Sequence, residues 1–422
     1  MNLEHHQAVI IGGGPAGLAA AIRLREKGVE DVVVLEREGQ TGGILRQCIH
    51  DGFGLTRFGE SLSGPEYAQR FVDEAQALGI PCLTDTTVLK LDGDRTVTAS
   101  GPAGLRHIRG DAVLLTMGCR ERTRGALAIP GSRPAGIWTA GVAQEYINLR
   151  NRMVGREVVI LGSGDIGLIM ARRMTLEGAQ VLACVEVMPY SGGLNRNIVQ
   201  CLHDYDIPLY LSHTVTDIRG RDRVEQVVVS KVDEHRQPIP GTEMVFDCDT
   251  LLLSVGLIPE NELTRQAGIA MDPRTNGAVV YENMETSLPG VFACGNVAHV
   301  HDLVDFVTAE SQRAGRAAAD YVLGGAVPDG PVLEVKNGDG VTYTVPQRIR
   351  PSRVEKVCDL FFRVNRICGD SEILVTSGDT QIAKFPREHL APGEMEHIVL
   401  PRVLLDKASE TLTVSIREVE KK

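Results

Sequence analysis

The sequence lacks any Cys-x-x-Cys pair, although nine cysteines are spread over its 422 residues. A dithiol relay needs two sulfur atoms close enough to form a disulfide, and the cysteine spacing gives no indication of one. The cysteines also lack the spacing to histidine that zinc sites use, so we expect no metal site. Most of them are expected to be small core residues in a reducing compartment.

Long apolar runs and basic clusters are missing as well. No apolar stretch approaches the ~20 residues of a membrane-spanning helix, and the N-terminal MNLEHHQ lacks the basic and then apolar segments of a signal peptide. We therefore expect a cytoplasmic protein that is not integral to a membrane. The formal net charge is −11 without a lysine or arginine cluster, which argues against nucleic acid as a partner.

What the sequence does contain is a dinucleotide-binding pattern at its N-terminus. A β-branched run is followed by a glycine turn, an apolar helix pattern and a second run, VVVLE. Gly12, Gly14 and Gly17 have the G-x-G-x-x-G spacing, and Glu36 ends the second run 24 residues after Gly12 (36 − 12). The first glycine permits a tight turn, the second lets a pyrophosphate approach the backbone, and the third lets the helix pack on the strand. Glu36 would then bind ribose hydroxyls.

The same pattern recurs 150 residues later (162 − 12). Gly162, Gly164 and Gly167 repeat the spacing, and Glu186 lies at the same 24-residue distance from the first glycine (186 − 162). A carboxylate at this position accepts hydrogen bonds from an unphosphorylated ribose and repels a 2′-phosphate. We therefore expect the second unit to bind NADH in preference to NADPH. A nucleotide fold that has lost its ligand is the alternative.

The order of these patterns predicts an α/β protein with two Rossmann-like dinucleotide-binding domains and a small C-terminal β domain. The first domain is expected to be discontinuous, over residues 1–150 and 257–328, with the second domain, 151–256, inserted in it. Residues 329–422 change to short alternating runs such as VTYTVP and TLTVSIREV, which predict a mostly antiparallel β domain. Its exposed strand edges need covering, so we expect it to act as an interface.

The segment SLPGVFACGNV resembles the second FAD-binding motif of the pyridine nucleotide–disulfide oxidoreductase superfamily. Together with the two glycine turns, the resemblance covers roughly residues 7–328 and implies an FAD domain with an inserted NAD(H) domain. In the family, the motif ends in Gly-Asp and the acid binds the ribityl chain, whereas this sequence has Gly295 and Asn296. An asparagine still forms a hydrogen bond with a hydroxyl group. The following helix is expected to direct its N-terminus, near Val304, at the flavin N1 and C2=O edge.

The resemblance also implies which residues bind each cofactor. For FAD these are Gly12, Gly14, Pro15, Ala16, Gly17, Glu36, Arg37, Gly43, Val88, Thr116, Gly118, Gly295, Asn296 and Val304. For NAD(H) they are Gly162, Ser163, Gly164, Asp165, Ile166, Gly167, Glu186 and Gly256.

Further segments narrow the resemblance. GCRERTRGALAIPGSRPAGIWTAGVAQ is similar to a motif series in the FAD/NAD-fold subunits of multisubunit amine and opine dehydrogenases. GGILRQCIHDGFG, SGPEYAQRF and ACGNVAHVHDLVDFV resemble a subfamily that occurs beside an anaerobic-type glycerol-3-phosphate dehydrogenase and a small cysteine-bearing protein, and that is associated with NADH oxidase or diaphorase activity. The resemblance thus implies a dehydrogenase partner subunit, a small cysteine-bearing electron-transfer protein and a homo- or hetero-oligomer.

Cys48 lies in the region where a flavin disulfide reductase has its redox-active pair, 12 residues after Glu36 (48 − 36). Single-cysteine NADH oxidases and peroxidases place a sulfenic-acid cysteine at a similar position, which requires a lowered pKa. His50, His299 and His301 are candidates to flank the isoalloxazine and donate protons. Cys48 and His301 are therefore the candidate catalytic residues. The alternatives are an inert cysteine beside the flavin and histidines in surface or capping roles.

With two dinucleotide sites and no dithiol, we expect hydride exchange directly between nicotinamide and FAD, with electrons passed to an acceptor that is not a disulfide. The leading hypothesis is a diaphorase-type (NADH:acceptor) subunit of a larger dehydrogenase, of the glycerol-3-phosphate type. One alternative is a self-contained NADH oxidase or peroxidase that uses Cys48. The other is a non-catalytic scaffold subunit with a structural nucleotide.

Overall fold

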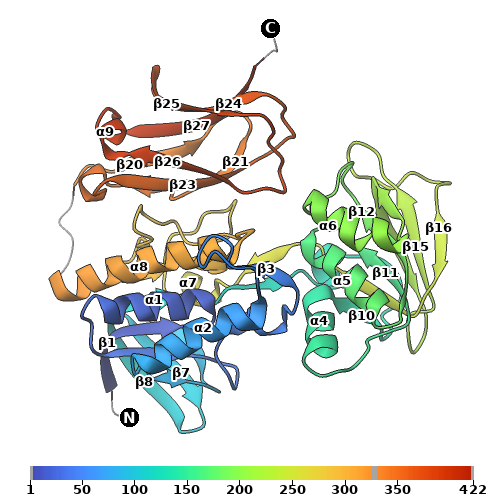
Figure 1. Ribbon diagram of the computed structural model, residues 1–422, viewed down its shortest axis with the longest axis horizontal. Coiled ribbons are helices and arrows are strands. Elements are labelled where there is room, and N and C mark those ends of the chain that lie inside the picture. The colour runs from blue at the N-terminus through green and yellow to red at the C-terminus, as the bar shows by residue number, and fades with distance from the viewer. Residues whose placement is uncertain (1–2, 325–329, 420–422) are drawn as a thin grey trace. The chain divides into compact units, whose positions relative to one another are not determined.

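The computed structural model describes residues 3–324 and 330–419. The chain forms two compact units, the first comprising Met1–Cys119 and Pro259–Lys422 and the second comprising Arg120–Ile258 (Figure 1). The boundary expected between residues 328 and 329 lies outside the described residues.

A seven-stranded sheet forms the base of the first unit, with the strand order β5-β2-β1-β8-β7-β6 and with β19 paired to β8. β1 (Leu3–Ile11) is parallel both to β2 (Val32–Leu35) and to most of β8 (Gly104–Leu115), from His107 onward. These runs of valine, isoleucine and leucine are buried, as is typical of parallel strands. The other strands are β5 (Cys82–Leu83), β6 (Thr87–Leu91), β7 (Thr96–Gly101) and β19 (Val291–Ala293).

Helix α1 (Pro15–Glu26) lies between α2 (Gly64–Ala77) and α8 (Val304–Gly324) (Figure 1). The contact with α8 is close, because a Cβ built on Gly315 would lie 2.5 Å from the Ala20 carbonyl oxygen. Gly295, just before α8, likewise meets Ala16 at the start of α1. α1 and α8 therefore run in the same direction, with their N-termini at one end. Short elements complete this part: η1 (Gly43–Gln47), β3 (Asp51–Phe53), β4 (Leu62–Ser63), α7 (Glu262–Gln266) and η3 (Gly295–Val297).

The second unit has a five-stranded parallel sheet and a three-stranded antiparallel sheet. The parallel sheet has the order β10 (Ile137–Thr139), β17 (Thr250–Leu253), β11 (Glu157–Leu161), β12 (Gln180–Glu186) and β13 (Leu209–Leu211). The antiparallel sheet consists of β14 (His213–Arg219), β15 (Gln226–Lys231) and β16 (Met244–Asp247). The helices are α3 (Arg124–Leu127), α4 (Ala140–Asn148), α5 (Asp165–Leu176), α6 (Asn195–Cys201) and η2 (His203–Tyr205).

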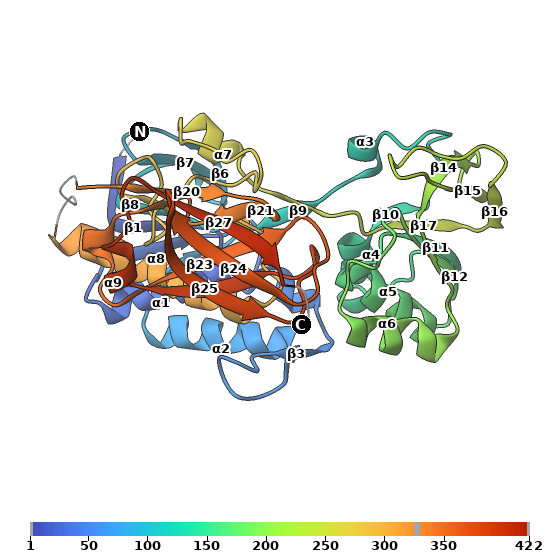
Figure 2. The ribbon, with the colours of Figure 1, turned by 90° about the horizontal axis from the view of Figure 1, so that it is seen from above.

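The C-terminal β domain has its own core within the first unit. One sheet has the order β22 (Arg348–Ile349), β20 (Leu333–Asn337), β27 (Thr411–Glu418), β24 (Ser371–Ser377) and β25 (Thr380–Arg387). The other has the order β21 (Val341–Val345), β23 (Val357–Val364) and β26 (Glu396–Pro401), and η4 (Pro351–Arg353) and α9 (Arg402–Leu405) connect strands. In both views the β domain lies over α8 (Figure 2). The Phe306 and Phe361 rings meet there, with their centroids 5.6 Å apart.

The boundary expected at residue 150 is wrong, because the chain enters the second unit at Arg120. β10 is the edge strand of the parallel sheet and pairs with β17, for example Ile137 with Leu251. Its three residues are too short to give an alternating pattern, so the sequence indicates only a connection there. β9 (Cys119–Glu121) and β18 (Leu257–Pro259) pair with each other where the chain passes between the units. The chain returns at Pro259, close to the expected position.

Within residues 3–324 and 330–419, none of the helices combines the length and hydropathy needed to cross a bilayer.

The core of the β domain gives a stability prediction. Phe362 in β23 is fully buried, so Phe362→Ala should lower the free energy of unfolding of this domain by about 3–5 kcal/mol. Trp138 is the only tryptophan and lies in the second unit. In urea titrations, the circular dichroism of Phe362→Ala should show part of the unfolding at a lower urea concentration than in the native protein. The midpoint of the Trp138 fluorescence transition should be the same in both proteins. An equal shift of both signals would contradict separate cores.

Candidate functional site

The first glycine turn joins β1 to α1, and two of its glycines are required by the chain itself. Gly12 has a φ of 111°, and a Cβ there would lie 2.6 Å from the Thr116 carbonyl oxygen. A Cβ on Gly17 would lie 1.8 Å from the Gly12 carbonyl oxygen. At these two positions, a side chain would clash with the backbone of the protein itself, whether or not a ligand is bound.

Gly14 is different, because nothing in the described chain requires a glycine there. Its φ of −78° is accessible to any residue, and an added Cβ would meet only the Gly43 Cα, at 3.7 Å. Gly14 is the N-cap of α1, and no side chain forms a capping hydrogen bond there. An uncapped helix N-terminus beside a residue without a side chain is the arrangement that a pyrophosphate group needs.

Glu36 lies against this turn at the end of β2. Its carboxylate is 7% exposed and accepts hydrogen bonds from Gly13 N (2.7 Å) and Glu38 N (2.8 Å). Backbone N–H donors thus fix the carboxylate in place beside the open position at Gly14. A ribose next to the pyrophosphate would find this acceptor already oriented.

Further predicted residues converge on the same turn from distant parts of the sequence. A Cβ on Gly43 would lie 2.9 Å from the Gly14 Cα, and one on Gly295 would lie 2.9 Å from the Ala16 Cβ. Thr116 Oγ1 donates a hydrogen bond to the carbonyl oxygen of the last residue of β1 (2.8 Å). The structure therefore brings these residues together around the N-terminus of α1.

The structure places the remaining predicted FAD residues in several different elements. Pro15 and Val304 are the first residues of α1 and α8. Val88 is half-buried in β6. The Arg37 side chain is 66% exposed and forms an ion pair with Glu38 (Nε to Oε1, 3.6 Å). Gly118 has a φ of 70° with open space around it, so the chain uses its left-handed conformation there.

The second glycine turn, between β11 and α5, repeats the first. Gly162 has a φ of 103°, and a Cβ there would lie 2.0 Å from the Ser254 carbonyl oxygen. A Cβ on Gly167 would lie 2.4 Å from the Gly162 carbonyl oxygen. Gly164 has a φ of −68°, and no atom of the described residues lies within 4 Å of an added Cβ. The second glycine again leaves a space that the chain does not fill.

Glu186 is buried at the end of β12, where it corresponds to Glu36. Its carboxylate accepts hydrogen bonds from Ser163 N (3.0 Å), Ser163 Oγ (2.8 Å) and Met188 N (3.0 Å). The three residues after it, Val-Met-Pro, carry no charge. The chain therefore places a fixed carboxylate, and no cation from these residues, where a 2′-phosphate would lie.

The other predicted NAD(H) residues have mixed roles. Asp165 is the first residue of α5, but its carboxylate accepts hydrogen bonds from Leu194 N (2.9 Å) and Asn197 Nδ2 (2.6 Å). It therefore holds the loop before α6. Ile166 packs against the core of the second unit. Gly256 follows β17 with a φ of 99° and open space around it.

Cys48 lies near the first turn but lacks the properties of a nucleophile. Its side chain is 6% exposed, and its Sγ donates a hydrogen bond to the Ile44 carbonyl oxygen (3.4 Å). Burial raises the pKa of the thiol to about 12. The thiolate is then roughly one part in 10⁵ at neutral pH. All nine cysteines lie in the described part of the chain, and none is in a disulfide.

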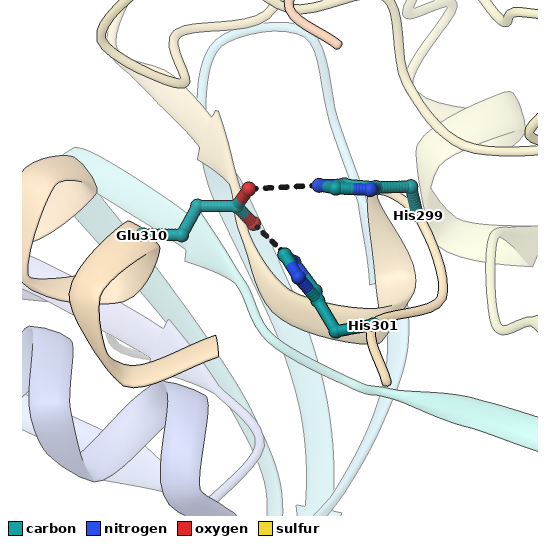
Figure 3. A group of neighbouring side chains, drawn as sticks. All are labelled: His299, His301 and Glu310. Atoms are coloured by element: carbon teal, nitrogen blue, oxygen red, sulfur yellow. Dashed lines mark hydrogen bonds and ion pairs between the residues drawn. The ribbon is translucent and has the colours of Figure 1, made fainter. Parts of the chain in front are cut away.

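His301 belongs to a buried group that we call the histidine–glutamate cluster, formed by His299, His301 and Glu310 (Figure 3). His299 Nε2 lies 2.8 Å from Glu310 Oε2, and His301 Nε2 lies 3.3 Å from Oε1. Gly295 N donates a third hydrogen bond to Oε1 (2.8 Å). The side chains of the two histidines are 0% exposed. His301 therefore points to Glu310 and not to an open flavin site. His50 is separate, near the surface.

The carboxylate at the centre of the cluster is ionised. Burial alone would raise the pKa of Glu310, but the two histidines outweigh it and hold this pKa well below its usual value. Burial, and then the neighbouring His301, lower the pKa of His299 to about 4. At neutral pH, Glu310 is therefore ionised and His299 is neutral.

Sequence reasoning missed Glu310, which stands inside an alanine-rich helix. A signal was present, because Val307, Glu310, Ala314 and Ala318 lie at helical spacing on the buried face of α8. A glutamate at such a position requires buried hydrogen-bond partners. Two histidines and a carboxylate are also metal-ligand types, and their ligand atoms lie within 4.8 Å of one another. Here each Nε2 atom already interacts with the carboxylate, whereas both Nδ1 atoms are buried without a hydrogen-bond partner among the described residues.

Comparisons with known proteins agree with this geometry. Residues 6–318 match the family described as pyridine nucleotide-disulphide oxidoreductase. A putative glutamate synthase (NADPH) small chain of Cereibacter sphaeroides is 28% identical over 75% of this chain and 77% of its own. Hydrogen cyanide synthase subunit HcnB of Pseudomonas protegens is 25% identical over 62% of this chain and 58% of its own. A CoA-dependent NAD(P)H sulfur oxidoreductase of Pyrococcus abyssi is 27% identical over 70% and 63%. The chain thus spans less than two thirds of the last two relatives.

Solved structures show the same fold. The thioredoxin reductase of T. acidophilum has a TM-score of 0.63 at 23% identity, over 76% of this chain and 99% of its own. A NAD-dependent persulfide reductase of A. fulgidus has a TM-score of 0.58 at 20% identity, over 87% and 67%. The predicted fold class, with its Rossmann-like sheets, is confirmed. The chain belongs to the pyridine nucleotide-disulphide oxidoreductase family and is an oxidoreductase that depends on FAD and a nicotinamide nucleotide.

Proposed function

We propose that this chain exchanges hydride directly between NAD(H) and FAD and passes electrons to an acceptor that is not a disulfide. The observation that carries the proposal is the pairing of two complete glycine-turn and carboxylate sites with a Cys48 thiol that is buried and has a pKa of about 12. A protein of this family without a dithiol relay has its flavin as the remaining redox group.

The first turn is the FAD site in this proposal. Gly14 and the N-terminus of α1 receive the pyrophosphate, and Glu36 accepts hydrogen bonds from the adenosine ribose. Gly295 and Asn296 would contact the ribityl chain. The Asn296 Oδ1 accepts a hydrogen bond from His301 N (3.1 Å), and its Nδ2 interacts with Cys119 Sγ (3.6 Å). This orients an uncharged amide, where the family has a carboxylate. Bound FAD supplies the two-electron chemistry.

The second turn is the NAD(H) site. Gly164 and the N-terminus of α5 receive the pyrophosphate, and Glu186 binds the 2′- and 3′-hydroxyls of the adenosine ribose. A 2′-phosphate would be repelled by the fixed carboxylate of Glu186 and could not donate the hydrogen bond that a 2′-hydroxyl donates to it. NADH is therefore the preferred nucleotide.

We also propose that the chain works as a subunit of a larger cytoplasmic dehydrogenase. The printed names of two relatives, a glutamate synthase small chain and a hydrogen cyanide synthase subunit, describe subunits of larger enzymes. The β domain supports the same idea, because the thioredoxin reductase match covers 99% of that chain but leaves 24% of this one unmatched (100 − 76). Glycerol 3-phosphate as the partner's substrate rests on the sequence resemblance of three segments.

Anaerobic titration of the FAD-loaded protein tests the proposed function. NADH should bleach the flavin band near ~450 nm, because hydride reaches the flavin without a thiol. NADPH should require a roughly 10–100-fold higher concentration. Glu186→Ser should narrow that ratio, whereas Gln180→Ser, at the exposed start of the same strand, should leave it unchanged. An unbleached flavin would support the scaffold alternative instead.

The glycines of the second turn give a matched pair of variants. Gly164→Ala should leave the Trp138-monitored unfolding unchanged but weaken NADH binding by roughly 10-fold or more, because the methyl group occupies the proposed pyrophosphate position. Gly167→Ala should lower the free energy of unfolding by about 1–3 kcal/mol, because its Cβ would lie 2.4 Å from the Gly162 carbonyl oxygen. If a folded Gly164→Ala protein still bound NADH as tightly as the native protein, the second turn would not be the nucleotide site.

Cys48→Ser separates direct hydride transfer from the peroxidase alternative. The variant should keep NADH-driven flavin bleaching within about twofold of the original rate, since no step uses the thiol. Native Cys48 should resist iodoacetamide at pH 7 and react about tenfold faster with each added pH unit, because its pKa is raised to about 12. If the native protein reduced peroxide and Cys48→Ser did not, that result would establish the peroxidase alternative.

A further inference from the structure

The histidine–glutamate cluster has vacant proton positions. Both histidines direct Nε2 at Glu310, the geometry in which a neutral ring with its proton on Nε2 donates to the carboxylate and keeps a lone pair on Nδ1. Both Nδ1 atoms are buried and have no hydrogen-bond partner among the described residues. With both rings in this neutral form, the negative charge of the cluster is that of Glu310, and each unpartnered Nδ1 is a site for one more proton.

The charges around the cluster are already paired with one another. Arg363, from the β domain, donates to the Val300 carbonyl oxygen (3.3 Å) and pairs with Asp302. Arg313, on α8, pairs with Asp359 at 2.9 Å, and Asp359 also binds His397 at 2.9 Å. The other titratable groups that face the cluster are Cys294, directly after β19, and Tyr343 on β21, whose hydroxyl accepts a hydrogen bond from Arg363 Nε (3.1 Å). No described cation forms a hydrogen bond with Glu310, so only the histidines can neutralise it.

The cluster is linked by the backbone to the turn at Gly295 and Asn296. Gly295 N donates to Glu310 Oε1 (2.8 Å), and His301 N donates to Asn296 Oδ1 (3.1 Å). This turn belongs to the proposed FAD site, so a coupling between the cluster and the flavin rests on the proposed function. In the proposed site, transfer of a hydride to the flavin would add one negative charge beside that turn. A second negative charge near the buried Glu310 would favour proton uptake by the cluster.

We propose that the histidine–glutamate cluster takes up one proton from solvent, at Nδ1 of His299 or His301, when the flavin is reduced. The hydride leaves NADH with two electrons and its proton, and NAD⁺ and the anionic reduced flavin result. The solvent proton binds separately to Nδ1, and the imidazolium stays hydrogen-bonded to Glu310. The charge of the cluster changes from −1 to zero, and oxidation of the flavin releases the proton again. The three residues act as positioning residues for charge, since they do not contact the reacting atoms.

The midpoint potential of the FAD-loaded protein, measured against pH with a chemical reductant, tests this coupling. Each proton bound with a two-electron couple changes the potential by about 30 mV per pH unit. The native protein should bind two solvent protons per flavin, one on the flavin and one on the cluster, and give a slope of about 60 mV per pH unit. His299→Asn combined with His301→Asn should give about 30 mV. His107→Asn, on the N-terminal half of β8, is the matched control and should keep the native slope.

Two further readouts on the native protein keep the test independent of the variants. The absorption of the reduced flavin must be that of the anion, because a neutral reduced flavin would carry the second proton itself. ¹⁵N-histidine NMR should then show protonation of one Nδ1 on reduction. A native slope of about 30 mV, a neutral reduced flavin or unchanged histidine signals would each overturn the inference. Because the reductant is chemical, failure of NADH to reduce the flavin would contradict the proposed function alone.

Discussion

The close packing of α8 on α1 is the constraint on which the first unit depends. Gly315 and Gly295 lack side chains where α8 and its preceding turn meet α1, and this lets the two helices lie side by side with their N-termini together. The same contact brings the Gly295 turn to the glycine turn after β1, about 280 residues earlier in the chain (295 − 14). It also places Glu310 behind that turn. Any residue that pushed α8 away would disturb the cofactor site, the cluster and the support of the β domain at once.

Much of the cofactor architecture could be predicted because its signals are local. Both glycine turns, with a carboxylate 24 residues after the first glycine, depend on the order of strand, turn, helix and strand within a short segment. The boundary at residue 150 failed because β10 is a strand only through its partner β17, more than 100 residues away. The environment of Cys48 was equally hidden, since burial arises from tertiary contacts that spacing does not record.

The side-chain orientations of the histidines and Glu310 could not be predicted from the sequence either. The sequence marks His299 and His301 as chemically interesting, but it gives no direction for their rings. Their orientation follows from the cost of burying Glu310, which must collect donors from Gly295 and from both histidines. A carboxylate on the apolar face of a helix is thus a better pointer to a buried network than the histidines that surround it.

The β domain meets the cluster region through an aromatic contact. Phe361 on β23 lies 5.8 Å from the His299 ring and 5.7 Å from the His301 ring, between centroids, and it stacks on His397 at 4.4 Å. This phenylalanine therefore forms part of the apolar surroundings of the buried Glu310 carboxylate, which lies next to the proposed FAD site. A protein that shifted the β domain on docking would admit water to these surroundings. Under the proposed coupling between the cluster and the flavin, the fit of the β domain would then help to set the redox potential of the flavin, and docking of a partner would change it.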